Sequence, residues 1–159
     1  MKHVTLAAIE RAIGVVDNLD DDQLEATFEK YTLSQQVLLD YVMSAPTEYE
    51  NEELEGLLVY YFCLISECFN QEGIALREVK EEDIDELEEP YFDMLDQYFE
   101  DEDEEILESF CDQPEMTQFM AMEVSTDDDD GSSFSDDTAS QLFIVTLAMI
   151  SLLNRAIVS

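Results

Sequence analysis

The chain has 159 residues, of which 41 are Asp or Glu and 6 are Lys or Arg, so its formal net charge is −35 at pH 7. This charge repels phosphate groups, which makes nucleic acid, anionic lipid headgroups and acidic substrates poor partners and favours basic ones. Hydrophobic residues make up 46% of the chain, which excludes a disordered acidic tail and predicts a single domain over residues 1–159.

The first 46 residues carry three short helical patterns. Apolar residues at helical spacing from Val4 to Val16 predict a first helix. Asp22 is the expected N-cap of a second helix, and Ser34 is the expected N-cap of a third, which ends at Pro46. These short, consecutive helices predict a compact bundle.

The strongest core helix is expected between Leu54 and Phe69, where large apolar residues recur every three or four positions. Either Thr47 or Asn51 would open it. Gly73 would close it as the residue that follows the C-cap, where glycine is favoured. Because this helix is apolar on most sides, we expect it to lie centrally.

Acidic and apolar residues interleave from Glu81 to Asp112. A core stripe is expected, broadened by further aromatic and aliphatic side chains; its members are Ile84, Leu87, Tyr91, Leu95 and Tyr98, with Phe92, Phe99, Ile106 and Phe110 beside them. Pro90 is expected to interrupt the stretch and to start a new helix, because proline is tolerated in the first turn of a helix and disrupts its interior.

The C-terminal part predicts two helices separated by a solvated loop. Pro114 starts the first helix, residues 125–137 form an Asp-rich and Ser-rich loop, and the last helix runs from about Asp137 to Ile157. The apolar run within that helix is shorter than the roughly 20 residues that a membrane span needs, so we expect a core helix. No strand-like alternation persists, and the predicted fold class is all-α, a single-domain compact bundle of about seven or eight helices with a strongly acidic face.

Catalysis is not indicated, and we expect no enzyme activity. His3 is the only histidine, so neither a two-His zinc helix, a di-iron bundle nor a Ser-His-Asp triad can be assembled. Cys63, Cys68 and Cys111 have mainly apolar neighbours and are expected to be buried thiols in a reducing compartment. The N-terminal residues do not match a signal peptide, and the expected location is the cytoplasm.

Two carboxylate patterns suggest metal sites but fit them poorly. The motif Glu104-Glu105-x-x-Glu108 would place acids on one helical face, as in all-helical magnesium-dependent nucleotide hydrolases, but a second Glu-x-x-Asp motif does not follow. If Gly131 is the sixth residue of a calcium loop, Thr126 takes the first position and Asp replaces the usual Glu at the twelfth. We therefore expect no metal or cofactor beyond weak cation association with the loop.

Charge is sorted unevenly along the chain. Residues 1–80 contain 16 acids and 5 bases, whereas residues 81–154 contain 25 acids and no Lys or Arg. Exposed helices usually mix both signs, because a Glu–Lys pair one turn apart stabilises a helix by about 0.2–0.5 kcal/mol. The Cβ atoms of acids one turn apart lie about 5–6 Å from each other, so we expect such a face to imitate the charge pattern of a nucleic-acid backbone.

We therefore predict an acidic module that binds a basic partner, such as a DNA-binding protein, nuclease or toxin, as a DNA-mimic-type or immunity-type inhibitor. Adaptation to high salt, a generic acidic helical protein and a module that docks a basic peptide are the alternatives. Direct binding to nucleic acid or membrane is not expected, and the oligomeric state is left open. The expected contact residues are Asp93, Asp96, Glu100, Asp101, Glu104, Glu105 and Glu108, with Asp127, Asp128, Asp129 and Asp130 as a flanking segment.

Overall fold

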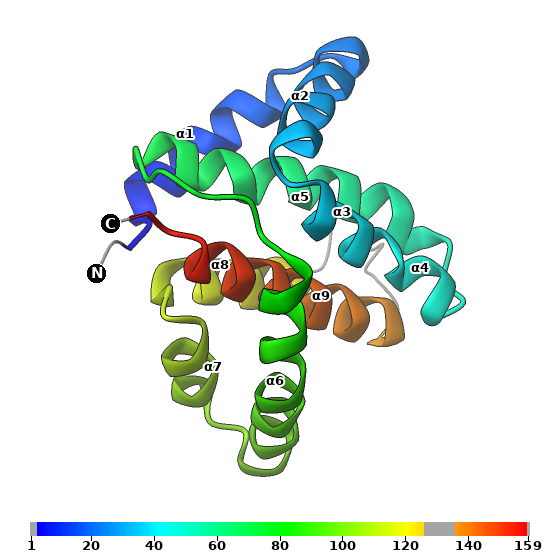
Figure 1. Ribbon diagram of the computed structural model, residues 1–159, viewed down its shortest axis with the longest axis vertical. Helices are drawn as coiled ribbons and strands as arrows, with labels where there is room; N and C mark the ends of the chain where they lie inside the picture. The colour runs from blue at the N-terminus through cyan, green and yellow to red at the C-terminus, as the bar shows by residue number, and fades with distance from the viewer. Residues whose placement is uncertain (1–2, 126–135, 159) are drawn as a thin grey trace.

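The computed structural model describes residues 3–125 and 136–158, and most of these residues are helical (Figure 1). Nine helices occur in the described ranges: α1 Leu6–Asp17, α2 Asp21–Ser34, α3 Gln36–Met43, α4 Ala45–Glu48, α5 Glu53–Gln71, α6 Glu81–Asp101, α7 Glu104–Cys111, α8 Pro114–Ser125 and α9 Asp136–Arg155. Because α4 is a single turn, eight longer helices remain. The predicted all-α fold is confirmed; within the described ranges β pairing is limited to one isolated bridge, between Leu76 and Ile157.

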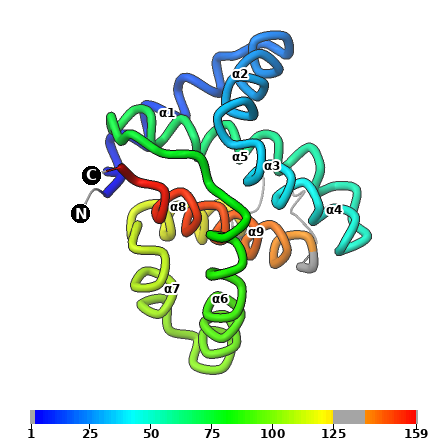
Figure 2. Tube along the Cα trace, in the orientation of Figure 1, coloured from blue at the N-terminus to red at the C-terminus, as the bar shows by residue number. Residues whose placement is uncertain are grey.

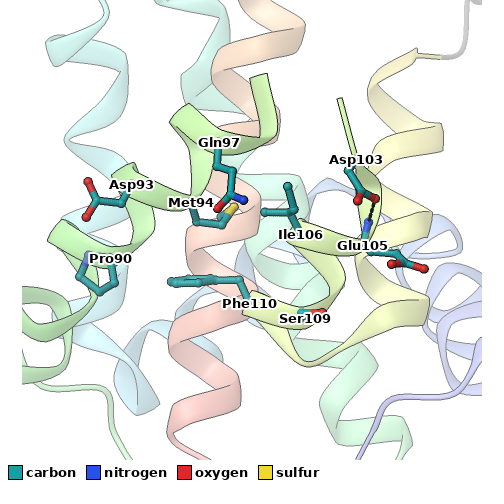
Figure 3. A pocket seen from close by; sticks show the side chains of 9 residues that line it. All are labelled: Pro90, Asp93, Met94, Gln97, Asp103, Glu105, Ile106, Ser109 and Phe110. Atoms are coloured by element: carbon teal, nitrogen blue, oxygen red, sulfur yellow. Dashed lines mark hydrogen bonds between the residues drawn. The ribbon is translucent and has the colours of Figure 1, made fainter. Parts of the chain in front are cut away.

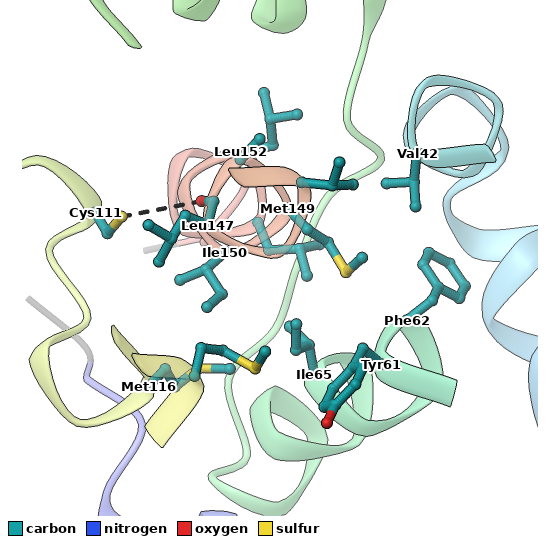
Figure 4. Close-up of a cluster of buried hydrophobic side chains, with 14 of the residues drawn as sticks. Val42, Tyr61, Phe62, Ile65, Cys111, Met116, Leu147, Met149, Ile150 and Leu152 are labelled. Carbon is teal, nitrogen blue, oxygen red and sulfur yellow. Dashed lines mark hydrogen bonds between the residues drawn. The ribbon is translucent and has the colours of Figure 1, made fainter. Parts of the chain in front are cut away.

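The centre of the core lies between α5 and α9. Helix α5 packs against α1 to α4 on its other sides, and α9 also contacts α3, α6, α7 and α8. Side chains from both helices fill the space between them, among them Phe62 and Ile65 of α5 and Met149 and Ile150 of α9 (Figure 4). Burying one such large side chain stabilises the fold by about 1.5–3 kcal/mol. The central position expected for the Leu54–Phe69 helix is confirmed, because α5 packs against α1 to α4 as well as against α9.

Helix α9 contributes a long apolar stretch to this core. Among the described helices, the stretch Thr138–Arg155 alone has the length and composition of a candidate membrane span, and 67% of it is buried inside the fold. Apolar length is weak evidence for a span when the helix is surrounded by other helices, since a core helix passes the same test. Its docking into the bundle agrees with the expected core helix.

The start of α2 differs from the sequence prediction. Asp20 caps this helix, and Asp22 lies within its first turn. The Asp20 carboxylate accepts a hydrogen bond from the Gln23 N–H at 2.8 Å, while the Gln23 side-chain oxygen accepts one from the Asp20 N–H at 3.0 Å. This reciprocal capping box satisfies two backbone donors at once. Helix α2 therefore begins at Asp21, directly after its N-cap Asp20.

The corner between α2 and α3 depends on Gln35, which the sequence analysis overlooked. Ser34 was expected to cap α3, but α2 continues through it, and its hydroxyl lies 3.4 Å from the Lys30 carbonyl oxygen. Gln35 is 5% exposed; its side chain accepts from the Val79 N–H at 2.8 Å and donates to the Arg77 carbonyl at 2.9 Å. These two bonds tie the corner to the segment that precedes α6.

The end of α5 follows the sequence prediction. Its start differs from the prediction, because the N-cap is Glu52 and neither Asn51 nor Thr47; the Asn51 side-chain oxygen nevertheless accepts a hydrogen bond from the Glu53 N–H at 3.1 Å. Gly73 has a φ of +73°, and the next residue, Ile74, donates its N–H to the Phe69 carbonyl at 3.1 Å. This is the hydrogen bonding of a Schellman motif, in which glycine takes the left-handed position without a steric penalty.

Helix α6 continues through Pro90, so the expected start of a new helix at this residue is wrong. Proline lacks an N–H, which leaves the Glu86 carbonyl without its helical donor. The continuous helix keeps Leu87 and Tyr91, on either side of the proline, in the same core face, and the Tyr91 hydroxyl donates a hydrogen bond to the Ile144 carbonyl of α9. Burial along this face holds the helix together across the missing bond.

Candidate interface for a basic partner

Helices α6 and α7 lie side by side at one end of the molecule (Figures 1 and 2). Helix α6 ends at Asp101, its C-cap residue Glu102 has the left-handed φ of +53°, and α7 begins directly after Asp103. The Asp103 carboxylate caps α7 by accepting a hydrogen bond from the Glu105 N–H at 3.0 Å. The turn therefore divides the run of six acids at residues 100–105 between two helices. We call residues 81–111 the acidic lobe; they contain 16 Asp and Glu residues.

The structure brings the described candidate contact residues together on the acidic lobe. The exposed members on α6 and α7 are Asp93, Asp96, Glu100, Asp101, Glu104 and Glu105. Glu108 is half-buried and accepts a hydrogen bond from the Gln118 amide of α8 at 2.6 Å, so it is less available to a partner. The segment Asp127 to Asp130 lies outside the described residues, as does most of the loop considered for calcium.

Arginine compensates the lobe only near the start of α6. The Arg77 guanidinium makes two hydrogen bonds to the Asp83 carboxylate, at 2.7 and 2.9 Å, and Arg155 lies 2.7 Å from Glu86. Over the part of the chain that the structure describes, no Lys or Arg forms an ion pair with a carboxylate from Asp93 to Glu108. Among the described residues, no Lys or Arg therefore compensates the negative charge at the far end of the lobe.

The Arg77–Asp83 pair should make stability depend on pH. The Arg77 guanidinium, helped by the Lys80 N–H, lowers the pKa of Asp83 from 3.8 to about 2. A lowered folded-state pKa stabilises the fold above about pH 4, and this stabilisation of about 1–2 kcal/mol is lost as the pH falls towards 2. Urea unfolding at pH 7, 4 and 2 should therefore show a smaller loss between pH 4 and 2 for Asp83→Asn than for the unmodified protein.

Asp85→Asn is the matched control for this experiment, because Asp85 is exposed on the same helix. It should retain the acid-dependent loss of the unmodified protein. An Asp83→Asn variant with the same pH dependence as the Asp85→Asn control would contradict the assigned role of the pair.

A groove of about 660 Å³ separates α6 from α7 (Figure 3). Its floor is apolar and consists of Met94 from α6 with Ile106 and Phe110 from α7. The Phe110 ring lies 5.7 Å from the ring of the buried Tyr91, centroid to centroid, which fixes its position. Asp93 and Glu105 stand at opposite sides of the groove with their carboxylates directed outward (Figure 3). The groove is therefore apolar inside and acidic at its edges.

Two phenylalanines of α6 face solvent instead of the core. Phe92 and Phe99 were expected to broaden the core stripe, but they are 50% and 54% exposed. Each follows a tyrosine of the stripe, Tyr91 or Tyr98, and one residue turns the side chain by about 100° around the helix. As expected, Tyr91 is buried in the core, and Tyr98 is half-buried. The lobe thus presents aromatic surface among its carboxylates, a combination suited to contact with another protein.

The described cysteines and histidine are poorly placed for catalysis. Cys63, Cys68 and Cys111 are buried, as predicted. Burial is the main cause that raises the pKa of Cys63 to about 11 and that of Cys68 to about 12, so both thiols stay protonated and weakly nucleophilic. His3 is exposed and lies 3.1 Å from the Asp112 carboxylate. Residues 3–125 and 136–158 contain no group of three or more side chains arranged to hold a metal ion.

One buried carboxylate outside the lobe was missed by the sequence analysis. Glu67 is 6% exposed within α5; it accepts a hydrogen bond from the Tyr31 hydroxyl of α2 and another from the Gln71 amide at 2.7 Å. Burial, followed by the bond to Glu67, raises the pKa of Tyr31. A single acid inside an apolar run was the available signal. Its partners indicate that it joins α2 to α5.

Comparison of the chain with protein-family models, with curated proteins and with solved structures gave no match. The acidic lobe, with its uncompensated carboxylates, exposed phenylalanines and apolar groove, is the described feature with the clearest chemistry for recognition.

Proposed function

We propose that the protein is an acidic interaction module whose acidic lobe binds a basic, nucleic-acid-binding protein and occupies the surface that the partner uses for DNA or RNA. The observation that carries this proposal is the set of carboxylates from Asp93 to Glu108, none of which pairs with a Lys or Arg among the described residues. Leaving so many acids uncompensated opposes folding through self-repulsion, and a cationic partner relieves that repulsion.

Spacing along α6 supports imitation of a nucleic-acid backbone. Asp93, Asp96 and Glu100 are exposed and follow one another at intervals of three and four residues, a spacing at which successive Cβ atoms lie about 5–6 Å apart on one side of a helix. A groove lined with Lys and Arg would accept this row as it accepts phosphates. The complex would form quickly through electrostatic steering and weaken steeply with added salt.

Affinity capture from a lysate of the source organism tests the proposal. The protein is immobilised, the nuclease-treated lysate is applied at about 50 mM salt, and a salt gradient releases bound proteins for mass spectrometry. One nucleic-acid-binding protein, recovered in stoichiometric amount and displaced by added DNA, is the expected result.

A mixture of basic proteins that all leave at low salt would contradict the proposal. It would mean that the charge acts generically, as in a salt-adapted or plain acidic protein. A triple variant, Glu10→Lys, Glu25→Lys and Glu29→Lys, is the matched control, because these three acids are exposed on α1 and α2. It should capture the same partner as the unmodified protein.

A further inference from the structure

The groove between α6 and α7 adds a feature that charge imitation alone does not need. Met94, Ile106 and Phe110 form its apolar floor, while Asp93, Asp103 and Glu105 stand at its edges (Figure 3). Recognition of a row of charges requires only an exposed acidic face. An open groove of about 660 Å³ with an apolar floor can in addition cover apolar side chains of a partner.

We infer that this groove receives the apolar side chains of a cationic amphipathic segment of the partner, whose Lys or Arg residues face the acidic edges. The inference rests on the proposed function and specifies the partner's chemistry: apolar anchors flanked by basic side chains. The anchors exclude water from the floor, and the flanking cations pair with carboxylates that lack a Lys or Arg partner within the described chain.

Charge selects this occupant over the alternatives. A second copy of the chain also carries a net charge of −35, so two acidic lobes repel each other. Anionic lipids and nucleic acids are repelled for the same reason. A neutral apolar segment would cover the floor but leave the carboxylates at the edges unpaired. Only a segment that is both cationic and apolar satisfies the floor and the edges together.

The length of the groove limits the size of the anchor. Its lining on α6 runs from Pro90 to Gln97, which is about 10 Å of helix at about 1.5 Å per residue. That length matches roughly two turns of a partner helix, which would present apolar side chains three or four residues apart, as amphipathic helices do in grooves. Gln97 lies at the edge of the groove (Figure 3).

Two synthetic peptides test the inference by fluorescence anisotropy. Both have about 16 residues, or about four helical turns, and the same number of Arg and Lys residues. One has Leu at helical spacing on one face, and the other has Ser in place of each Leu. We expect the Leu peptide to bind at least about tenfold more tightly at about 150 mM salt, since one good apolar anchor changes affinity by about that factor.

Filling the groove should remove this preference. Gln97 is exposed and Gln36 is an exposed glutamine on α3, so Gln97→Trp blocks the groove and Gln36→Trp is its matched control. Gln97→Trp should weaken binding of the Leu peptide about tenfold and leave the Ser peptide unchanged. Circular dichroism and melting temperature, measured on both variants, verify that each is folded.

The outcomes separate this inference from the proposed function. Equal binding of both peptides, unaffected by Gln97→Trp, overturns the groove inference and leaves the acidic module intact. No binding of either peptide at about 50 mM salt overturns both. Sedimentation that shows a dimer of this chain, lost in Gln97→Trp but not in Gln36→Trp, would assign the groove to self-association and likewise overturn the inference.

Discussion

Replacing Asp96, Glu100 and Asp101 by Lys should weaken binding of the captured partner at least about a hundredfold at low salt. All three are exposed near the end of α6, and the change moves the net charge from −35 to −29. Losing three exposed ion pairs costs up to about 3 kcal/mol at about 0.2–1 kcal/mol each, and the three lysines also repel the partner's cations, so the total exceeds the roughly 3 kcal/mol that corresponds to about a hundredfold. Titration of the partner at about 50 and 200 mM salt would also show a shallower salt dependence.

The three lysines should not destabilise α6, so a loss of binding can be attributed to the interface. Cations are favoured near the C-terminus of a helix, each by about 0.3–1 kcal/mol, so lysines at these positions should leave α6 as stable as before. The triple variant of Glu10, Glu25 and Glu29 has the same net charge and should bind normally. Equal losses in both triple variants would show that total charge matters and the lobe does not, and unchanged binding in both would place the interface elsewhere.

Phe62→Ala should lower the free energy of unfolding by about 3–5 kcal/mol, the usual effect of truncating a buried phenylalanine. Phe62 is fully buried on α5, and its ring contacts the Phe28 ring edge to face, with 5.7 Å between the centroids. A chain of this size should lose about 10 °C or more in melting temperature. Urea unfolding followed by circular dichroism measures the loss directly.

Leu33→Ala is the control for the core variant, because Leu33 is 71% exposed and its truncation should change stability by less than about 0.5 kcal/mol. Added salt should partly restore the stability of Phe62→Ala, since it screens the repulsion between carboxylates. The range of this repulsion falls from about 30 Å at 0.01 M salt to about 8 Å at 0.15 M. Equal stability of the two variants would contradict the core position of Phe62. An unmodified protein that folds only in molar salt would instead favour salt adaptation.

Much of the fold could be predicted because the decisive signals are local. Apolar residues at helical spacing identified α5 and α9, and Gly73 marked the end of α5, since both depend on residues close together in the sequence. Pro90 was misjudged for the opposite reason. Its place inside α6 depends on packing of Leu87 and Tyr91 against the core. Gln35 was missed because its partners are more than 40 positions away.

The acidic character of the candidate site could be predicted from the sequence, but its groove could not. The absence of Lys and Arg from residues 81–154 pointed to the lobe, and Asp93, Asp96 and Glu100 are exposed on it. The groove requires α6 and α7 to meet across a turn inside an unbroken run of acids. A run of acids does not indicate where one helix ends and the next begins. The turn between α6 and α7 was therefore not predicted, and Ile106 and Phe110 were assigned to the core stripe.

The reaction of the buried thiols with an added reagent reports local opening of the fold. Cys63 and Cys68 lie in α5, at the centre of the core, whereas Cys111 is the last residue of α7 and its thiol contacts the Ser151 hydroxyl of α9 at 3.1 Å. A buried, protonated thiol reacts with an alkylating reagent only when its surroundings open, so each labelling rate measures the opening of one region. Comparing Cys111 with the two α5 thiols therefore distinguishes partial opening of α7 from unfolding of the whole chain, without introducing any mutation.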